Sequence, residues 1–148
     1  MEITPNEIKD AYKKVISVSW LDGIMSIFGG GAFQLTNLNY NPVNYDELAE
    51  IIAIDQTEKM EYVYNENEKY TCADFSYSLM GAFHKYHSTA AMPVFVTWII
   101  FGQYGHAVLS FYDDGEVFVI EPQNDDVITM EQAGEYYGGE LTLKLLNG

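Results

Sequence analysis

The sequence predicts an α+β fold in which helices come first and antiparallel strands follow. Apolar residues recur at helical spacing after Thr4, Asn44 and Thr71, each of which is a good helix N-cap. After Pro93 the pattern changes to β-branched and aromatic runs, at residues 94–101, 106–112, 116–121 and 141–146. No repeat, linker or low-complexity stretch divides the 148 residues, so we expect a single domain over residues 1–148.

The three helices are predicted from their first turns. Thr4 to Glu7 form a capping box with proline at the first helical position, which favours a helix over about Pro5–Val18. Asn44 caps a second, short helix, and Thr71 caps a third that begins at Cys72 and carries Asp74 at its third position. The glycine run at residues 28–33 indicates a turn between the first two helices; a phosphate loop would need a following Lys-Ser/Thr pair.

The strands after residue 93 include one hairpin whose register can be predicted. Asp114-Gly115 favours a two-residue type I′ turn, which pairs residue 113 with residue 116. His106 then falls opposite Gln123, with Glu121 as its diagonal neighbour on the same face. A three-residue turn would instead place Pro122 opposite His106 and turn Glu121 to the other face. In the last strand, residues 141, 143 and 145 are expected to share one face.

The composition limits the kind of partner. Twenty-two acidic residues against seven basic ones give a net charge of -15, which repels nucleic-acid phosphates and anionic membranes. We therefore expect no direct nucleic-acid binding and no membrane association. A basic protein partner, a divalent metal or mimicry of nucleic acid remains compatible with this charge.

The compartment is predicted from what the sequence lacks. One cysteine excludes an intramolecular disulfide, and no apolar run approaches the ~20 residues of a membrane span. The first residues have no basic region followed by an apolar core, so they do not form a signal peptide. We expect a cytoplasmic protein, or one in the host cytoplasm if the chain is phage-encoded.

The single cysteine, Cys72, lies in the first turn of a predicted helix, a position that affects the ionisation of its thiol. Unpaired N–H groups and the positive dipole end of a first helical turn favour a thiolate at Cys72 and could stabilise an oxyanion. The alternative is the usual one for a lone cysteine, a small buried hydrophobic residue. A thiolate acting in catalysis needs a base, so the three histidines decide between these interpretations.

Only one histidine can approach that cysteine. His84 lies twelve residues further along the same helix, about 18 Å away, and His87 lies beyond it. Both are expected to interact with the C-terminal end of their helix. His106 begins a strand, where Glu121 or Gln123 could hold its ring by a hydrogen bond.

The segments Tyr70–Phe75, Gly105–Ala107 and Ile120–Gln123 contain a cysteine, a histidine and an acid, 34 and then 15 residues apart. This order resembles that of papain-like and transglutaminase-like folds. The match is similar to the cysteine-protease-like C-terminal domain of the Marasmius oreades agglutinin and its stand-alone bacterial and phage relatives. The resemblance implies a papain-like or transglutaminase-like α+β fold, with N-terminal helices packed on an antiparallel sheet.

The resemblance also implies roles for individual residues. Cys72 matches the nucleophile, His106 the general base and Glu121 the residue that orients the base. Members of that family can hold a divalent cation beside the site, and Asp74 is the position here that matches a ligand, with calcium as the expected ion. Ala73 stands where the family often has a second acid, so capping of the helix by Asp74 alone is the alternative.

Two classes of function follow. The first is a cysteine-dependent hydrolase or acyl transferase that acts on a peptide or isopeptide bond of a peptide or protein substrate, with Cys72 as nucleophile and His106 as base. The second is a catalytically inactive acidic binding protein, such as a phage-type inhibitor that mimics nucleic acid and binds a basic partner.

Overall fold

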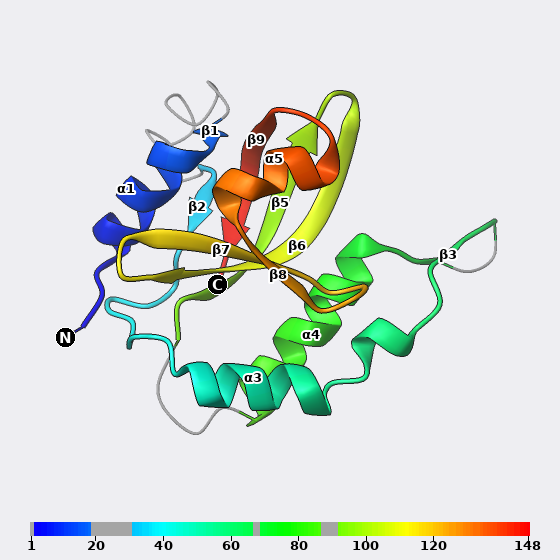
Figure 1. Ribbon diagram of the computed structural model, residues 1–148, viewed down its shortest axis with the longest axis horizontal. Coiled ribbons are helices and arrows are strands. Elements are labelled where there is room, and N and C mark those ends of the chain that lie inside the picture. The colour runs from blue at the N-terminus through cyan, green and yellow to red at the C-terminus, as the bar shows by residue number, and fades with distance from the viewer. Residues whose placement is uncertain (1, 19–30, 67–68, 87–91) are drawn as a thin grey trace.

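Helices cover both faces of a central β-sheet in the computed structural model, which describes residues 2–18, 31–66, 69–86 and 92–148 (Figure 1). The helices are α1 (Pro5–Val15), α3 (Tyr45–Ile54), the short 3₁₀ helix η2 (Thr57–Lys59), α4 (Cys72–Tyr86) and α5 (Met130–Tyr137). The strands are β1 (Ser17–Val18), β2 (Phe33–Gln34), β3 (Val63–Tyr64), β4 (Lys69–Tyr70), β5 (Val94–Phe101), β6 (Tyr104–Asp113), β7 (Glu116–Glu121), β8 (Asp126–Thr129) and β9 (Leu141–Asn147).

The main sheet has the strand order β1-β9-β5-β6-β7-β8, and β2 also pairs with β9. Strands β5 to β9 pair antiparallel, whereas the short strands β1 and β2 run parallel to β9. The α+β class is therefore confirmed, with a sheet that is mostly antiparallel.

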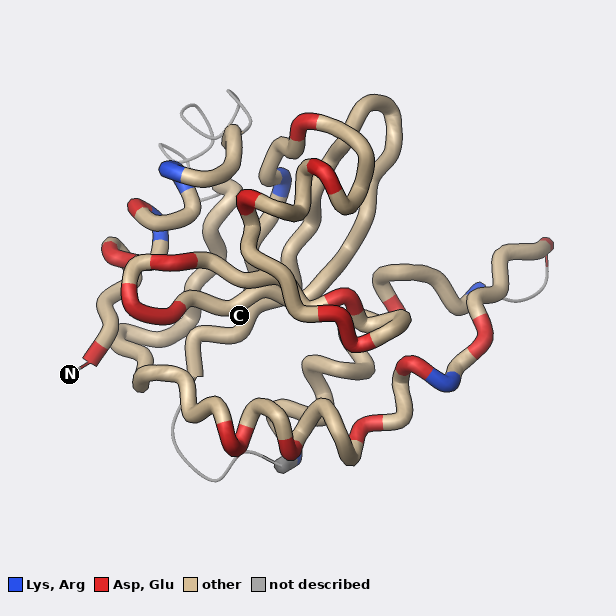
Figure 2. The backbone as a smooth tube through the Cα atoms, viewed as in Figure 1, with Lys and Arg blue, Asp and Glu red and all other residues tan. Residues whose placement is uncertain are grey.

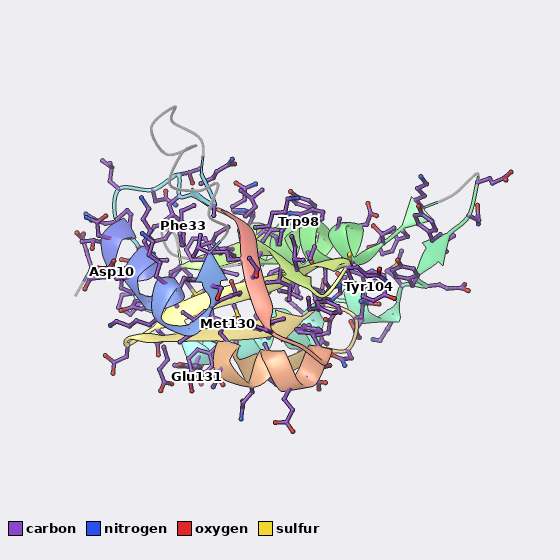
Figure 3. All side chains as sticks on the ribbon, turned by 90° about the horizontal axis from the view of Figure 1, so that it is seen from above. Asp10, Phe33, Trp98, Tyr104, Met130 and Glu131 are labelled. Atoms are coloured by element: carbon purple, nitrogen blue, oxygen red, sulfur yellow. The ribbon has the colours of Figure 1, made fainter. Side chains whose placement is uncertain are left out.

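Two hydrophobic cores lie on the two faces of this sheet. On one face α1 and α5 contribute Tyr12 and Met130, which pack with Ile99. On the other face α3 and α4 pack through a second cluster that contains Leu79 and Leu109. Seen from above, Met130, the first residue of α5, and the side chain of Trp98 lie on opposite sides of the sheet (Figure 3). The candidate active site lies where the pairing of β6 with β7 ends.

The predicted helix starts are confirmed, but the first helix is shorter than expected. Thr4 forms both arms of the capping box with Glu7, and Asn44 accepts a hydrogen bond from the N–H of Glu47. Helix α1 ends at Val15, not Val18, because residues 17 and 18 are extended and pair with β9. Pairing with β9 thus overrides the helical pattern of the sequence. Of the glycine run at 28–33, residues 28–30 lie outside the described part of the chain.

The predicted hairpin register is confirmed. Asp113 pairs with Glu116, and the ladder between β6 and β7 continues in the same register to Leu109 and Ile120. The two turn residues, Asp114 and Gly115, have φ angles of 43° and 91°, as a type I′ turn requires. The diagonal placement of residues 106 and 121 follows from this register.

The prediction that residues 141, 143 and 145 share one face of the last strand is wrong beyond Leu143. Ile99 of β5 pairs with Leu143, but the preceding Trp98 pairs with Leu145, so Lys144 is an extra residue on β9. Such a bulge reverses the alternation of side chains beyond it. Leu143 is therefore fully buried, and beyond the bulge Leu146 rather than Leu145 is buried.

The sequence interpretation also missed β8 and α5, so the expectation that helices only precede the strands is corrected. Helix α5 begins after Thr129, which forms a capping box with Gln132, and it ends at Gly138 with φ 83°. The Thr-x-x-Gln pattern at 129–132 is the signal that could have found this helix. Among the described residues, no helix is both long enough and apolar enough to span a membrane.

Candidate active site

Cys72 lies in the first turn of α4, as predicted. The N–H of Phe75 donates to the carbonyl oxygen of Thr71 over 3.0 Å, which closes the first turn immediately around Cys72. The cysteine is partly buried and carries a free thiol. A thiol in this position lies at the positive end of the helix dipole, which favours its charged form.

A gap in the sheet gives this thiol a backbone partner. The β6–β7 ladder ends at Leu109 and Ile120, so the earlier part of β6 has no ladder partner on that edge. The N–H of Ala107, in this open part of β6, hydrogen-bonds the Cys72 sulfur, and the N–H of Ala73 does the same from within the helix. Because the β6–β7 ladder ends at these residues, the first turn of α4 can contact the open edge of β6.

His106 and Glu121 meet across the same gap. The His106 Nε2 atom lies 2.7 Å from the Glu121 Oε2 atom, and both side chains are largely shielded from solvent. The His106 ring also makes a hydrogen bond with the Cys72 side chain. Because Nε2 faces Glu121, Nδ1 is the ring nitrogen left for the sulfur. The structure therefore brings Cys72, His106 and Glu121 into one continuous chain of hydrogen bonds.

The hydrogen bonds in this chain favour a charged pair. Hydrogen bonding to His106 lowers the pKa of the Cys72 thiol, against the opposing effect of burial. Burial alone would lower the pKa of His106, but hydrogen bonds to Cys72 and Glu121 overcome it and raise that pKa to about 9. The two shifts run in opposite directions, so the thiolate and the imidazolium stabilise each other.

Further side chains hold the carboxylate. The backbone N–H and the side-chain Nε2 of Gln123 donate to Glu121 Oε1 over 3.2 and 3.3 Å. The Tyr137 hydroxyl, from α5, donates to Glu121 Oε2 over 2.9 Å, and the centroid of its ring lies 5.2 Å from that of His106. Although burial raises the pKa of Glu121, its hydrogen bonds to His106 and Tyr137 lower it overall. Gln123 thus contacts the carboxylate, and Tyr137 is a site residue that the sequence interpretation missed together with its helix.

Asp74 is engaged in capping. Its Oδ2 atom accepts from the N–H of Thr71 over 2.8 Å and from the Thr71 hydroxyl over 3.1 Å. The backbone hydrogen bond is the main reason why the pKa of Asp74 lies below its ordinary value. Within the described ranges, no three His, Cys, Asp or Glu side chains are grouped so as to hold a metal ion. The geometry therefore matches the capping alternative.

The helix histidines lie away from this chain of hydrogen bonds. His84 belongs to the last part of α4 and lines a separate cavity, and His87 lies outside the described residues. That cavity contains none of the residues Cys72, His106 and Glu121.

Comparison with known proteins identifies a shared fold but no family. No protein-family model and no curated protein sequence matches the chain. Among solved structures, the complex of PSL1a with E64 matches with a TM-score of 0.73 at 13% identity, over 99% of this chain and 51% of that chain. A Polyporus squamosus lectin bound to the human-type influenza-binding epitope Neu5Acα2-6Galβ1-4GlcNAc matches with a TM-score of 0.61 at 15% identity, over 78% of this chain and 41% of that one.

These findings correct the resemblance stated from the sequence. The matched structures are of Polyporus squamosus lectin, so the assignment to the cysteine-protease-like domain of the Marasmius oreades agglutinin is wrong. Three short motifs in a fixed order constrain the arrangement of elements, but they do not specify a particular protein. At these identities the likeness shows the fold alone, and the chain spans 51% and 41% of the length of the two chains it matches.

Proposed function

We propose that this chain is a cysteine-dependent hydrolase or acyl transferase that acts on a peptide or isopeptide carbonyl. The observation that carries the proposal is the hydrogen-bonded chain from the Cys72 thiol through the His106 ring to the Glu121 carboxylate. Nucleophile, base and orienting acid in this relation are the requirement for thiol acyl transfer. A cysteine that opens a helix and a histidine and acid on the following hairpin are also consistent with a papain-like arrangement of elements.

The reaction follows from these positions. The Cys72 sulfur attacks the carbonyl carbon and forms a C–S bond, and the carbonyl electrons move to oxygen. Backbone N–H groups in the first turn of α4 are suited to stabilise this oxyanion. His106 then gives its proton to the leaving nitrogen, the C–N bond breaks, and an amine departs.

The second half of the reaction regenerates the thiolate. Water, or a second amine in acyl transfer, loses a proton to His106 and attacks the thioester carbon. The C–S bond breaks and the acid or new amide is released. Glu121 holds the imidazole in place throughout and stabilises its charged form. A working thiol has to stay reduced, which supports the cytoplasm as the proposed compartment.

The complex of PSL1a with E64 suggests a direct chemical test of the proposed nucleophile, Cys72. E64, the compound bound to PSL1a, carries an epoxide that a thiolate opens with formation of one C–S bond. Because Cys72 is the single cysteine, any thiol adduct marks this residue. We expect E64 and iodoacetamide to label Cys72 at neutral pH much faster than they label free cysteine, measured by intact-mass spectrometry over time.

Two variants sharpen this prediction. His106→Ala removes the partner of the thiolate, so labelling at neutral pH should slow by up to about tenfold for each unit by which the pKa of the thiol rises above the working pH. The matched control His84→Ala removes a histidine from the same molecule, at about 18 Å from Cys72, and should label like the wild type. Equal rates for His106→Ala and the wild type would mean that His106 is not the base.

The charge of the molecule favours one second candidate, an acidic binding protein without catalytic activity. A net charge of -15 suits a partner with a basic surface, and acidic residues are distributed over several elements (Figure 2). Labelling of Cys72 no faster than free cysteine would support this candidate and overturn the enzyme proposal.

A further inference from the structure

Tyr137, the last residue of α5, is held beside the candidate active site by its neighbours. Helix α5 packs against β7 and β8, and it ends at Gly138, whose left-handed φ of 83° closes the helix directly after the tyrosine. The Tyr137 ring stacks on Phe101, with 5.8 Å between the ring centroids, and meets the Tyr136 ring edge-on at 4.9 Å. These contacts fix the ring of Tyr137 and therefore the direction of its hydroxyl.

The Tyr137 hydroxyl and the His106 ring use the same oxygen of Glu121. The hydroxyl donates to Oε2 over 2.9 Å, and His106 Nε2 lies 2.7 Å from that oxygen, whereas the two donors of Gln123 use Oε1. Burial and the charge of Glu121 raise the pKa of Tyr137, so its hydroxyl stays protonated over the range in which His106 titrates. Oε2 is thus shared between a donor that is always present and a ring whose charge changes with pH.

A fixed donor on Oε2 weakens the attraction between the Glu121 carboxylate and the imidazolium of His106. The positive end of the Tyr137 O–H dipole points at this oxygen and offsets part of its negative charge, and it also opposes the positive charge of the neighbouring ring. The Cys72 sulfur and the Glu121 carboxylate favour the charged ring, whereas Asp126 of β8 and the preceding tyrosine of α5 act on the hydroxyl itself. The Tyr137 hydroxyl therefore opposes the two groups that raise the pKa of His106.

We propose that Tyr137 is a positioning residue whose hydroxyl fixes the Glu121 carboxylate and limits how tightly that carboxylate holds the proton on His106. The proposed reaction needs this balance, because the imidazolium must pair with the thiolate and must still give its proton to the leaving nitrogen. An acid that holds its proton too tightly transfers it more slowly. The inference rests on the proposed function and adds a residue to its machinery.

The variant Tyr137→Phe removes the hydroxyl and keeps the ring that stacks on Phe101. Without the fixed donor, the pKa of His106 should rise above its wild-type value of about 9, by about half a unit or more. The chain contains three histidines, so NMR with isotope-labelled histidine can follow this titration. A merely structural loss would loosen the hydrogen bonds of His106 and move its pKa toward the ordinary value of 6.5, so the direction of the shift separates the two explanations.

The matched control is Tyr136→Phe, the same chemical change one residue earlier on α5. The Tyr136 hydroxyl donates to Asp126 over 2.8 Å and accepts from the side chain of Asn124 over 2.9 Å, so it has partners of its own. This variant should leave the titration of His106 unchanged.

A second variant tests the proposal with the opposite sign and replaces Tyr137→Phe if that protein does not fold. In 3-fluorotyrosine, introduced at position 137 alone, the fluorine withdraws electron density and makes the hydroxyl a stronger donor to Glu121. The pKa of His106 should then fall below its wild-type value. A rise or no change with 3-fluorotyrosine would contradict the proposal.

Alkylation of Cys72 by iodoacetamide gives a second readout of the same proton. The reactivity of the thiolate changes when the imidazolium loses its proton, because the thiolate then loses its charged partner and becomes more basic. This step of the pH–rate profile should move upward in Tyr137→Phe together with the NMR titration. Fast labelling of the wild type, combined with a His106 pKa that is unchanged or lower in Tyr137→Phe, would overturn the role of Tyr137 and leave the proposed function intact. Slow labelling of the wild type would overturn the proposed function itself.

Discussion

Glu121 is the residue on which the hydrogen bonds of the candidate site converge. It is 5% exposed, and it is the one acidic side chain among the buried residues that the structure describes. A buried carboxylate is costly unless it is paired and hydrogen-bonded. Here four donors surround it: the His106 ring, the Tyr137 hydroxyl, and the backbone and side chain of Gln123. This degree of satisfaction makes the position of the carboxylate, and hence of the His106 ring, well defined.

The ionisation of His106 gives a prediction at the scale of a residue. We expect its ring to titrate near pH 9 by NMR, well above its ordinary value of 6.5. Because the folded state holds this proton more tightly, His106 stabilises the fold below pH 6.5, and that contribution is lost as the pH rises through about 9. Hydrolysis should decline over the same upper range, because the leaving nitrogen needs the imidazolium proton.

The variant Glu121→Gln tests the origin of this shift. Replacing the carboxylate by an amide removes the negative charge and should lower the pKa of His106, with each unit corresponding to about 1.4 kcal/mol. Alkylation of Cys72 at neutral pH should slow in parallel, because the thiolate loses the support of the imidazolium. An unchanged titration of His106 would show that Glu121 does not set its charge.

At the scale of an element, α4 illustrates how one residue can carry two interpretations. Asp74 occupies the third helical position, where a carboxylate can either bond the N-cap or ligate a cation from outside. In the structure it bonds Thr71, the N-cap residue, through both the backbone N–H and the hydroxyl. This contact orders the turn that carries Cys72, so the cap and the nucleophile depend on the same few residues.

The cap predicts a measurable loss of stability. Asp74→Asn removes a negative charge from the first turn of α4 and weakens the hydrogen bond to the Thr71 N–H, so it should lower the free energy of unfolding by about 0.3–1 kcal/mol. The contribution of the carboxylate should be present above its ordinary pKa of 3.8 and be lost as the pH falls through the lower value of the folded state. Thermal unfolding of both proteins, with and without millimolar calcium, checks this. A midpoint that rises with calcium in the wild type alone would restore the ligand interpretation.

At the scale of the whole molecule, local signals account for what the sequence could predict. The N-caps Thr4, Asn44 and Thr71 and the Asp114-Gly115 turn each act within a few residues, and the helix starts and hairpin register that they predict are confirmed. The register alone placed Glu121 near His106. A cysteine at the start of α4 and a histidine on the following hairpin were enough to select the catalytic candidates.

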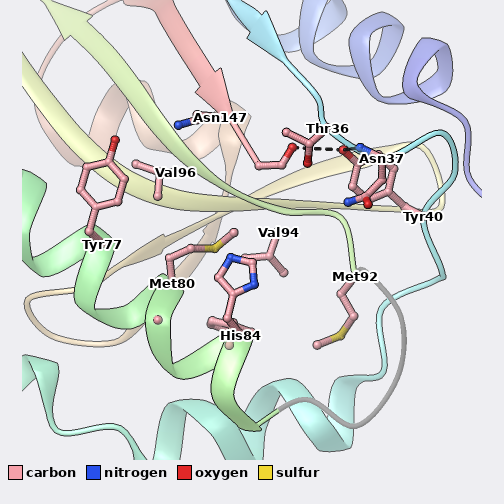
Figure 4. Close-up of a pocket in the computed structure, with 13 residues that line it drawn as sticks. Thr36, Asn37, Tyr40, Tyr77, Met80, His84, Met92, Val94, Val96 and Asn147 are labelled. Carbon is pink, nitrogen blue, oxygen red and sulfur yellow. Dashed lines mark hydrogen bonds between the residues drawn. The ribbon is translucent and has the colours of Figure 1, made fainter.

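The features that the sequence could not predict depend on long-range packing. The end of α1 is set by the pairing of Ser17 with β9, and the bulge at Lys144 is set by the pairing of β9 with β5. Tyr137 joins the site because α5 packs near β7, a contact that no local pattern encodes. The cavity that His84 lines likewise forms where four separate segments of the chain meet, at residues 36–40, 77–84, 92–96 and 147–148 (Figure 4).

The early end of the β6–β7 ladder has a consequence for hydrogen exchange. In β6 the amide of Leu109 lies where the strand pairs with Ile120, whereas the amide of Ala107, beyond the ladder, is held by the sulfur of Cys72. Protection of the Ala107 amide from deuterium therefore reports the state of the thiol. In Cys72→Ala we expect Ala107 to exchange about tenfold faster or more, with Leu109 unchanged as the internal reference. Equal protection of Ala107 in both proteins would place its partner elsewhere in the sheet.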